Sequence, residues 1–108
     1  MHNKFARYKT GSSLYGSDKW KHKRSCVLRR DGYIDQIDKR YGKTTEATIV
    51  HHIFPLEDYP QYAYCDWNLI SVSAKNHNKL HNQDGSLTPA GEHLLQRTKE
   101  KAITLGLI

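Results

Sequence analysis

Hydrophobic positions in the first half of the chain follow a helical period. Trp20 and Val27 stand seven positions apart among basic side chains, so residues 18–30 predict an amphipathic helix that buries both. This segment is bounded by ordinary helix signals: the N-cap Ser17, Gly32 just past its end, and a short turn or extended stretch over residues 33–37.

The pattern then becomes extended. Residues 44–53 (TTEATIVHHI) are rich in β-branched side chains and predict a strand that ends before Pro55. A loop with several tyrosines leads to a second predicted strand over residues 69–72. Ser73 can cap a short helix over about residues 74–81. The order strand, loop, strand, helix predicts an α+β domain.

Thr88 and Pro89 predict the start of a last helix that ends near Gly106 and buries Leu94, Leu95 and Ala102. The chain shows no internal repeat. We therefore expect a flexible basic arm over residues 1–16 and one domain over residues 17–108, with its strand–strand–helix part over about residues 44–82.

Composition narrows the class of protein and its cellular location. The 108 residues have a mean hydropathy of −0.80, and no stretch approaches the ~20 apolar residues of a membrane helix. The first ten residues are polar and basic, unlike a secretory signal. The two cysteines are too few for a disulfide framework or a four-thiolate zinc site. We expect a cytoplasmic protein.

Charge is concentrated at the N-terminal end. Residues 1–43 hold twelve Lys or Arg against four Asp or Glu, whereas the remainder holds five against seven. A basic segment on a nearly neutral body suits a polyanion such as DNA, although a solvated basic face without a partner has the same composition. The candidate DNA contacts are Lys19, Lys21, Lys23, Arg24, Arg29, Arg30, Lys75 and Lys79.

Four of the seven histidines fall within 31 residues. His51 and His52 are adjacent in the first strand, so their side chains leave opposite faces. His77 and His81 are four apart in the short helix, which places their Cβ atoms ~5–6 Å apart, close enough to hold one divalent ion. Asn68 precedes the second strand and can bond the loop backbone. Each residue alone is more simply a surface or turn residue, but together they indicate a site.

Two zinc classes are excluded. A metalloprotease helix needs Glu directly after its first His, and here Asn78 follows His77. A Cys2His2 finger needs a Cys pair before its His pair, and this chain has none there.

The residues His51-His52-Ile53-x-Pro55, Asn68-Leu69-Ile70 and His77-Asn78-x-x-x-His81 resemble the motif of the HNH endonucleases, the ββα-metal nucleases. The steps of 16 residues from His52 to Asn68 and nine from Asn68 to His77 are typical of that family. Ser17-x-x-Trp20 and Leu28-x-Arg30-Asp31-Gly32-Tyr33 also resemble the lead-in helix of its small phage-type members. The resemblance implies a ββα-metal core between an N-terminal and a C-terminal helix.

The resemblance also implies roles. His52 is expected as the general base and Asn68 as the residue that orients it through the loop. His51 and His77, with His81 as a third ligand, are expected to hold one divalent ion (Mg²⁺, Mn²⁺, Ni²⁺ or Zn²⁺). The implied reaction is DNA hydrolysis, by nicking or double-strand cleavage, to 5′-phosphate and 3′-hydroxyl ends.

One feature departs from the family pattern. Many small members hold a structural zinc with two Cys-x-x-Cys pairs, whose places here are taken by Asp35, Asp38, Ser73 and Asn76. We expect no structural zinc and a metal-free hydrogen-bonded set, the alternative being an oxygen site for a hard cation. Cys26 and Cys65 are expected to be free thiols.

Three functional classes follow. The leading hypothesis is a metal-dependent HNH endonuclease that acts on double-stranded DNA. The alternative is a non-catalytic DNA-binding module on a decayed HNH fold, and a structural or assembly protein is the third. The resemblance to phage-type members further suggests a terminase-like packaging partner, no membrane partner, and the host cytoplasm as location if a phage encodes the chain.

Overall fold

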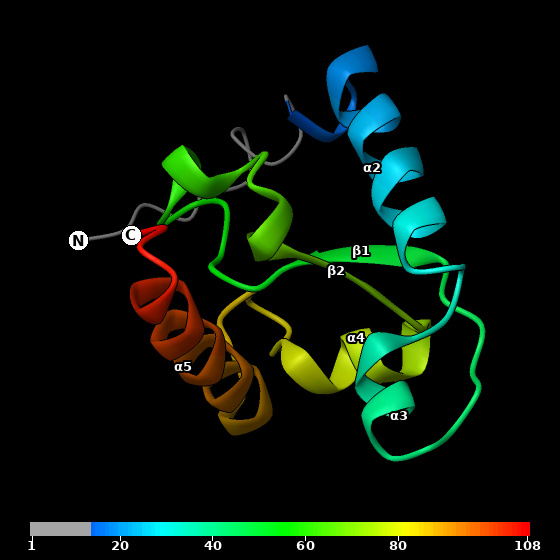
Figure 1. Cartoon of the computed structure of the whole chain (residues 1–108). Helices are drawn as coiled ribbons and strands as arrows, with labels where there is room; N and C mark the ends of the chain where they lie inside the picture. The colour runs from blue at the N-terminus through cyan, green and yellow to red at the C-terminus, as the bar shows by residue number, and fades with distance from the viewer. Residues whose placement is uncertain (1–13) are drawn as a thin grey trace.

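The computed structural model describes residues 14–108. A two-stranded antiparallel sheet lies at its centre with helices around it (Figure 1). The helices and strands are α2 (Asp18–Arg30), α3 (Gln36–Arg40), β1 (Ile49–His52), β2 (Leu69–Val72), α4 (Ala74–Leu80) and α5 (Pro89–Thr104). The loop between the strands contains two 3₁₀ turns, η1 (Pro60–Tyr62) and η2 (Asp66–Asn68). The predicted α+β class with a ββα core is confirmed.

Helix α2 forms as its sequence predicts. The Ser17 side chain accepts a hydrogen bond from the backbone N–H of Trp20 and so caps the helix N-terminus. The helix ends where Gly32 and Tyr33 both adopt positive φ angles, of 64° and 60°. Such backbone is costly for a tyrosine, and it turns the chain sharply back toward the sheet.

Strand β1 is shorter than the predicted strand over residues 44–53. It pairs with β2 from Ile49 opposite Val72 to His52 opposite Leu69. Beyond Val72, the next residue Ser73 already caps α4, so β2 does not extend alongside residues 44–48. One isolated bridge, between Ile34 and Glu46, extends the pairing on that side.

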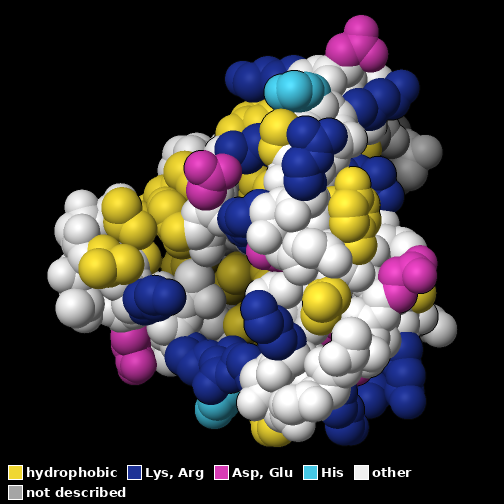
Figure 2. All heavy atoms as spheres, turned by 45° about the vertical axis from the view of Figure 1, so that its right-hand side comes forward, with side chains coloured by type: hydrophobic (Ala, Val, Ile, Leu, Met, Phe, Trp, Pro, Cys, Tyr) yellow, Lys and Arg dark blue, Asp and Glu magenta, His cyan; other side chains and the backbone are white. Residues whose placement is uncertain are grey.

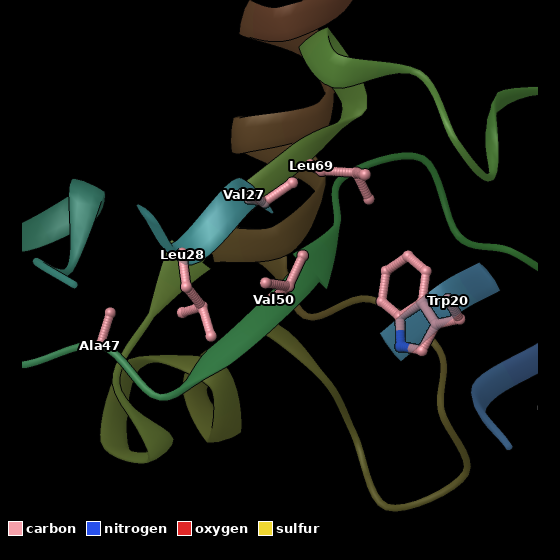
Figure 3. Close-up of a cluster of buried hydrophobic side chains, with 6 residues drawn as sticks. All are labelled: Trp20, Val27, Leu28, Ala47, Val50 and Leu69. Carbon is pink, nitrogen blue, oxygen red and sulfur yellow. The ribbon is translucent and has the colours of Figure 1, made fainter. Parts of the chain in front are cut away.

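The two faces of the sheet are covered by different helices. Helix α2 packs on one face, where Trp20, Val27, Leu28, Ala47, Val50 and Leu69 form a buried cluster (Figure 3). Helix α4 covers the other face and is backed by α5. A second buried cluster there consists of Ile53, Phe54, Leu80 and Leu94. Because successive strand residues point to opposite faces, β1 sends His52 toward α2 and His51 toward α4.

Helix α3 is absent from the prediction, which treats residues 33–37 as a turn or extended stretch. Asp35 starts this helix: one carboxylate oxygen accepts hydrogen bonds from the two backbone N–H groups of Ile37 and Asp38. The segment before it does run extended, since Ile34 bridges to Glu46. A helix of five residues is too short to show a hydrophobic period, so the cap was its sole signal in the sequence.

The four residues at the expected cysteine positions form one hydrogen-bonded set. The second carboxylate oxygen of Asp35 accepts bonds from the Ser73 backbone N–H (2.6 Å) and the Asn76 side chain (2.9 Å). The same Asn76 amide also bonds Asp38 (2.9 Å). Asp35 is fully buried. Burial acts to raise its pKa, but the hydrogen bonds from Ser73, Asp38 and Asn76 outweigh this effect and lower the pKa below its usual value.

Helix α5 approaches α4 closely at Gly91. A Cβ atom at this position would lie 2.4 Å from the carbonyl oxygen of Leu80 and 2.9 Å from the Leu87 side chain. Leu94 and Ala102 are buried as predicted, and Leu95 packs against the second cluster. Within the described residues, no helix combines the length and the apolar composition of a membrane span.

The predicted arm lies mostly outside the described residues, which begin at Leu14. The described part of the arm does not stand away from the domain. Leu14 packs against the cluster under α2, and the side chain of Tyr15 reaches His52.

Candidate active site

A cavity of about 480 Å³ opens where β1 meets α4 and the loop that follows it. Its walls carry all four histidines of the sequence motif, together with Tyr15 and Glu57. Residues from five separate parts of the chain therefore meet in one hollow. Asn68 of the motif does not line it.

His51, His77 and His81 converge in this cavity. Their ring centroids lie 4.9–5.6 Å apart, and one ligand nitrogen from each lies within 4.8 Å of the others. The predicted helix over residues 74–81 ends one residue early, at Leu80, and His81 is its C-cap with extended backbone. This turn of the chain still leaves the His81 ring beside that of His77.

Hydrogen bonds orient two of the three rings, those of His51 and His81. His81 donates from Nδ1 to the Gly85 carbonyl oxygen, 3.3 Å away. Its Nε2 can then accept the Nδ1–H of His51, at 3.1 Å. This leaves Nε2 of His51 as a bare lone pair, and that atom is buried with no hydrogen-bond partner among the described residues. A buried, unpaired nitrogen is costly. A cation held by all three rings would have to displace the hydrogen bond between His51 and His81, because that bond occupies the one lone pair of His81.

Burial keeps the inner rings uncharged. It is the largest cause that lowers the pKa of His51 well below its usual value, and the neighbouring His81, His77 and His52 lower it further. The pKa of His77 is lowered by burial and then by His81. Neutral imidazoles are the form that binds metals, so these residues fit one divalent ion.

His52 leaves β1 on the face opposite to His51, toward α2, while its residue still lines the cavity. It makes three contacts. Its Nε2 lies 3.0 Å from the Ala63 carbonyl oxygen and must donate to it. Its Nδ1 lies 3.2 Å from the Tyr15 hydroxyl. The ring stacks on the Trp20 indole, with centroids 4.8 Å apart. Burial lowers the pKa of His52, although the Ala63 hydrogen bond and Glu57 oppose this effect.

Asn68 is fully buried and does not touch His52. Its side-chain oxygen accepts the Phe54 backbone N–H at 2.7 Å. Its amide donates to the carbonyl oxygens of Phe54 and Tyr62. These bonds tie both ends of the loop between the strands, and that loop carries Ala63, the acceptor of His52. Asn68 therefore ties down the loop that carries the His52 acceptor, and its role in orienting His52 stays a prediction.

The candidate DNA contacts on α2 divide into two groups. Arg24 and Arg30 donate to backbone carbonyl oxygens, that of Thr48 for Arg24 (2.7 Å) and those of Asp66 and Leu69 for Arg30 (2.9 and 2.6 Å). Lys23 pairs with Asp66. These three side chains thus help to hold α2 on the sheet.

The other candidate contacts are more open. Lys21 and Arg29 are exposed on α2, and Lys75 and Lys79 on α4. Lys19 lies 4.1 Å above the Tyr64 ring. Figure 2 shows a face on which Lys and Arg side chains outnumber acidic ones but are interspersed with hydrophobic and neutral groups.

Sequence reasoning did not identify two neighbours of His52. Tyr15 was placed in the flexible arm, and Ala63 contributes a backbone oxygen that has no side-chain signature. Trp20 was recognised as buried, but its stacking on an imidazole depends on how α2 docks. Such contacts join residues 37 or 11 positions apart, and no local pattern predicts them.

The comparisons with known proteins agree with this geometry. No family model and no curated protein matches the chain. A solved structure does: the HNH endonuclease of the deep-sea thermophilic bacteriophage GVE2, crystallised with a manganese ion, is 33% identical. The match covers 69% of this chain and 82% of the phage protein, with a TM-score of 0.65. With this relative, the ββα core and the histidine cluster in its cavity, the chain belongs to the HNH endonuclease family.

Proposed function

We propose that this protein is a metal-dependent endonuclease that hydrolyses phosphodiester bonds of double-stranded DNA. The observation that carries the proposal is the placement of His52 beside the His51, His77 and His81 cluster in one cavity. The three-histidine cluster can hold a cation, and His52 can serve as the base.

His52 acts as the general base. Because Nε2 donates to Ala63, the free lone pair of the neutral ring is on Nδ1. This nitrogen takes a proton from the attacking water while the water oxygen bonds to phosphorus and the bond from phosphorus to the 3′ oxygen breaks. The leaving oxygen takes a proton from solvent water and His52 returns its proton to solvent, so the products are a 5′-phosphate and a 3′-hydroxyl. A lowered pKa keeps His52 unprotonated at neutral pH, as a base requires.

His51, His77 and His81 would hold the cation. A bound divalent ion supplies positive charge that stabilises the phosphate in the transition state and the departing oxygen. Imidazoles bind a metal in their neutral form, so three such ligands would leave the full charge of the ion available for phosphate. The manganese ion of the phage relative makes Mn²⁺ the first metal to test here, followed by Mg²⁺, Ni²⁺ and Zn²⁺.

DNA binding is assigned to the basic surface of α2 and α4. Lys21 and Arg29, with Lys75 and Lys79, are exposed and free of the backbone contacts that occupy Arg24 and Arg30. Each such residue that meets a phosphate releases a counterion, so binding is expected to weaken as salt rises.

A plasmid cleavage assay tests the function. Supercoiled plasmid with each metal is expected to be nicked or linearised, and EDTA is expected to stop the reaction. His52→Ala is expected to lower the rate at least about 100-fold, while His93→Ala, which removes an exposed histidine of α5, keeps the parent rate. Linear products that DNA ligase reseals would establish the expected ends.

Two outcomes of this assay would contradict the proposal. Cleavage by His52→Ala at the parent rate would exclude His52 as the base. Salt-dependent DNA binding without cleavage in any of the metals would instead indicate a non-catalytic binding module.

A further inference from the structure

Tyr15 reaches the site from outside the histidine motif. It stands three residues before α2, yet its hydroxyl oxygen lies 3.2 Å from Nδ1 of His52, and its side chain lines the same cavity. Nothing in the proposed chemistry uses this residue. Its contact nevertheless falls on the one atom of His52 on which that chemistry depends.

The direction of this hydrogen bond follows from the other side of the ring. A carbonyl oxygen only accepts, so Nε2 carries the proton of the neutral imidazole and Nδ1 carries the lone pair. Tyr15 must therefore donate its O–H to Nδ1. Burial of the hydroxyl is the main cause that raises the pKa of Tyr15 to about 12, and Glu57 adds to it, so the donor proton is present at any working pH.

Neighbouring residues position the Tyr15 ring, but its side chain is not enclosed on all sides. Its ring meets the edge of Trp20, with centroids 5.5 Å apart. Both the backbone N–H and the hydroxyl of Ser17 donate to the Leu14 carbonyl oxygen and close the turn around it. However, Tyr15 is 46% exposed, so its side chain can swing away without opening the core.

An imidazole nitrogen has one lone pair. While that lone pair accepts the Tyr15 hydroxyl, it cannot take a proton from water. We propose that Tyr15 is a further active-site residue, whose hydroxyl occupies Nδ1 of His52 in the DNA-free protein and must give up this hydrogen bond to the attacking water before cleavage. The inference rests on the proposed role of His52 and assigns a gating step to the same site.

The substitution Tyr15→Phe tests this inference, because it removes the hydroxyl and keeps the ring on Trp20. A net hydrogen bond of ordinary strength corresponds to a factor of about 2 to 10. We therefore expect the cleavage rate at subsaturating DNA to rise about 2- to 10-fold. A rate equal to the parent or below it would overturn the proposal, a lower rate indicating that Tyr15 assists the reaction.

Tyr64→Phe is the matched control. Tyr64 also packs edge-on against Trp20, with centroids 6.2 Å apart, but it does not hydrogen-bond His52 among the contacts of the described residues. This variant is expected to cut at the parent rate. The two variants together separate loss of a tyrosine hydroxyl near Trp20 from loss of the contact to Nδ1.

A spectroscopic readout separates this inference from the proposed function. In metal-free protein labelled with ¹⁵N-histidine, the Nδ1 signal of His52, assigned by its absence in His52→Ala, is expected to shift in Tyr15→Phe and not in Tyr64→Phe. An unmoved signal would overturn the Tyr15 contact whatever the cleavage assay shows. Unimpaired cleavage by His52→Ala would instead refute the proposed function, and the measured contact would stand.

Discussion

The indole of Trp20 lies almost parallel to the imidazole of His52, with ring centroids 4.8 Å apart and planes inclined by 23°. Both residues are buried, at 4% and 5% exposure. Trp20 belongs to the basic helix α2, so the proposed base is packed directly on the helix that offers much of the positive charge. Its ring orientation depends on this stack and on the Ala63 hydrogen bond.

Replacement of Trp20 by Leu is expected to slow cleavage by more than the loss of stability alone would explain. Removal of the stacked ring lets His52 tilt, and a misplacement of about 1 Å can cost up to about 100-fold in rate. The cleavage rate is measured at a temperature where the variant is folded.

Leu28→Ala is the control for Trp20→Leu. Leu28 lies in α2 and in the same buried cluster but does not reach His52, and its truncation costs about 2–5 kcal/mol of stability. If Leu28→Ala slows folded-state cleavage as much as Trp20→Leu, the stack has no special role.

Loss of His77 is expected to weaken metal binding. It is one of three converging imidazoles, and loss of even an outer-shell partner costs about 10- to 100-fold in affinity, so loss of a ligand should cost at least as much. Calorimetric titration of Mn²⁺ into His77→Ala and into His93→Ala makes the comparison. Equal affinities in the two variants would remove His77 from the ligand set.

The buried Asp35 predicts a specific acid sensitivity. Its pKa is lowered in the folded protein, so its contribution to stability is complete above the unfolded-state pKa of about 3.9. That contribution declines as the pH falls through the lower folded-state pKa. Urea unfolding from pH 7 down to pH 2 is expected to show this decline.

Asp35→Asn is expected to be less stable at pH 7 and less dependent on acid. An amide places N–H groups against the Ser73 N–H or the Asn76 amide, and each buried unpaired group costs about 1–3 kcal/mol. Glu100→Gln, which changes an exposed carboxylate of α5, is the control. Equal acid profiles for Asp35→Asn and the parent would show that Asp35 is not the titrating group.

Gly91→Ala is expected to destabilise the protein, although alanine usually favours a helix by about 1 kcal/mol over glycine. The added Cβ would meet the Leu80 carbonyl oxygen at 2.4 Å, and overpacking of this kind costs about 1–3 kcal/mol. Ala90→Gly, at the exposed neighbouring position, measures the propensity effect alone. A rise in the melting temperature of Gly91→Ala would show that α5 can move aside.

The local features of the fold were predictable because local chemistry sets them. Ser17, Ser73 and Thr88 each cap the helix that the sequence assigns to them. The neighbouring His51 and His52 leave opposite faces of β1 because side chains alternate along a strand. The length of that strand was overestimated, since β-branched residues favour extended backbone but a sheet also needs a partner.

The sequence by itself determined the caps, the hairpin and the family motif, because each is written in residues a few positions apart or at characteristic spacings. Only the tertiary structure decided that Tyr15 meets Nδ1 of His52, that Trp20 stacks on this ring, and that Asp35 bonds Ser73 and Asn76. The physical reason is that periodicity and capping report the backbone of one element. A contact between elements depends on how all of them pack, and no single segment of the chain encodes that packing.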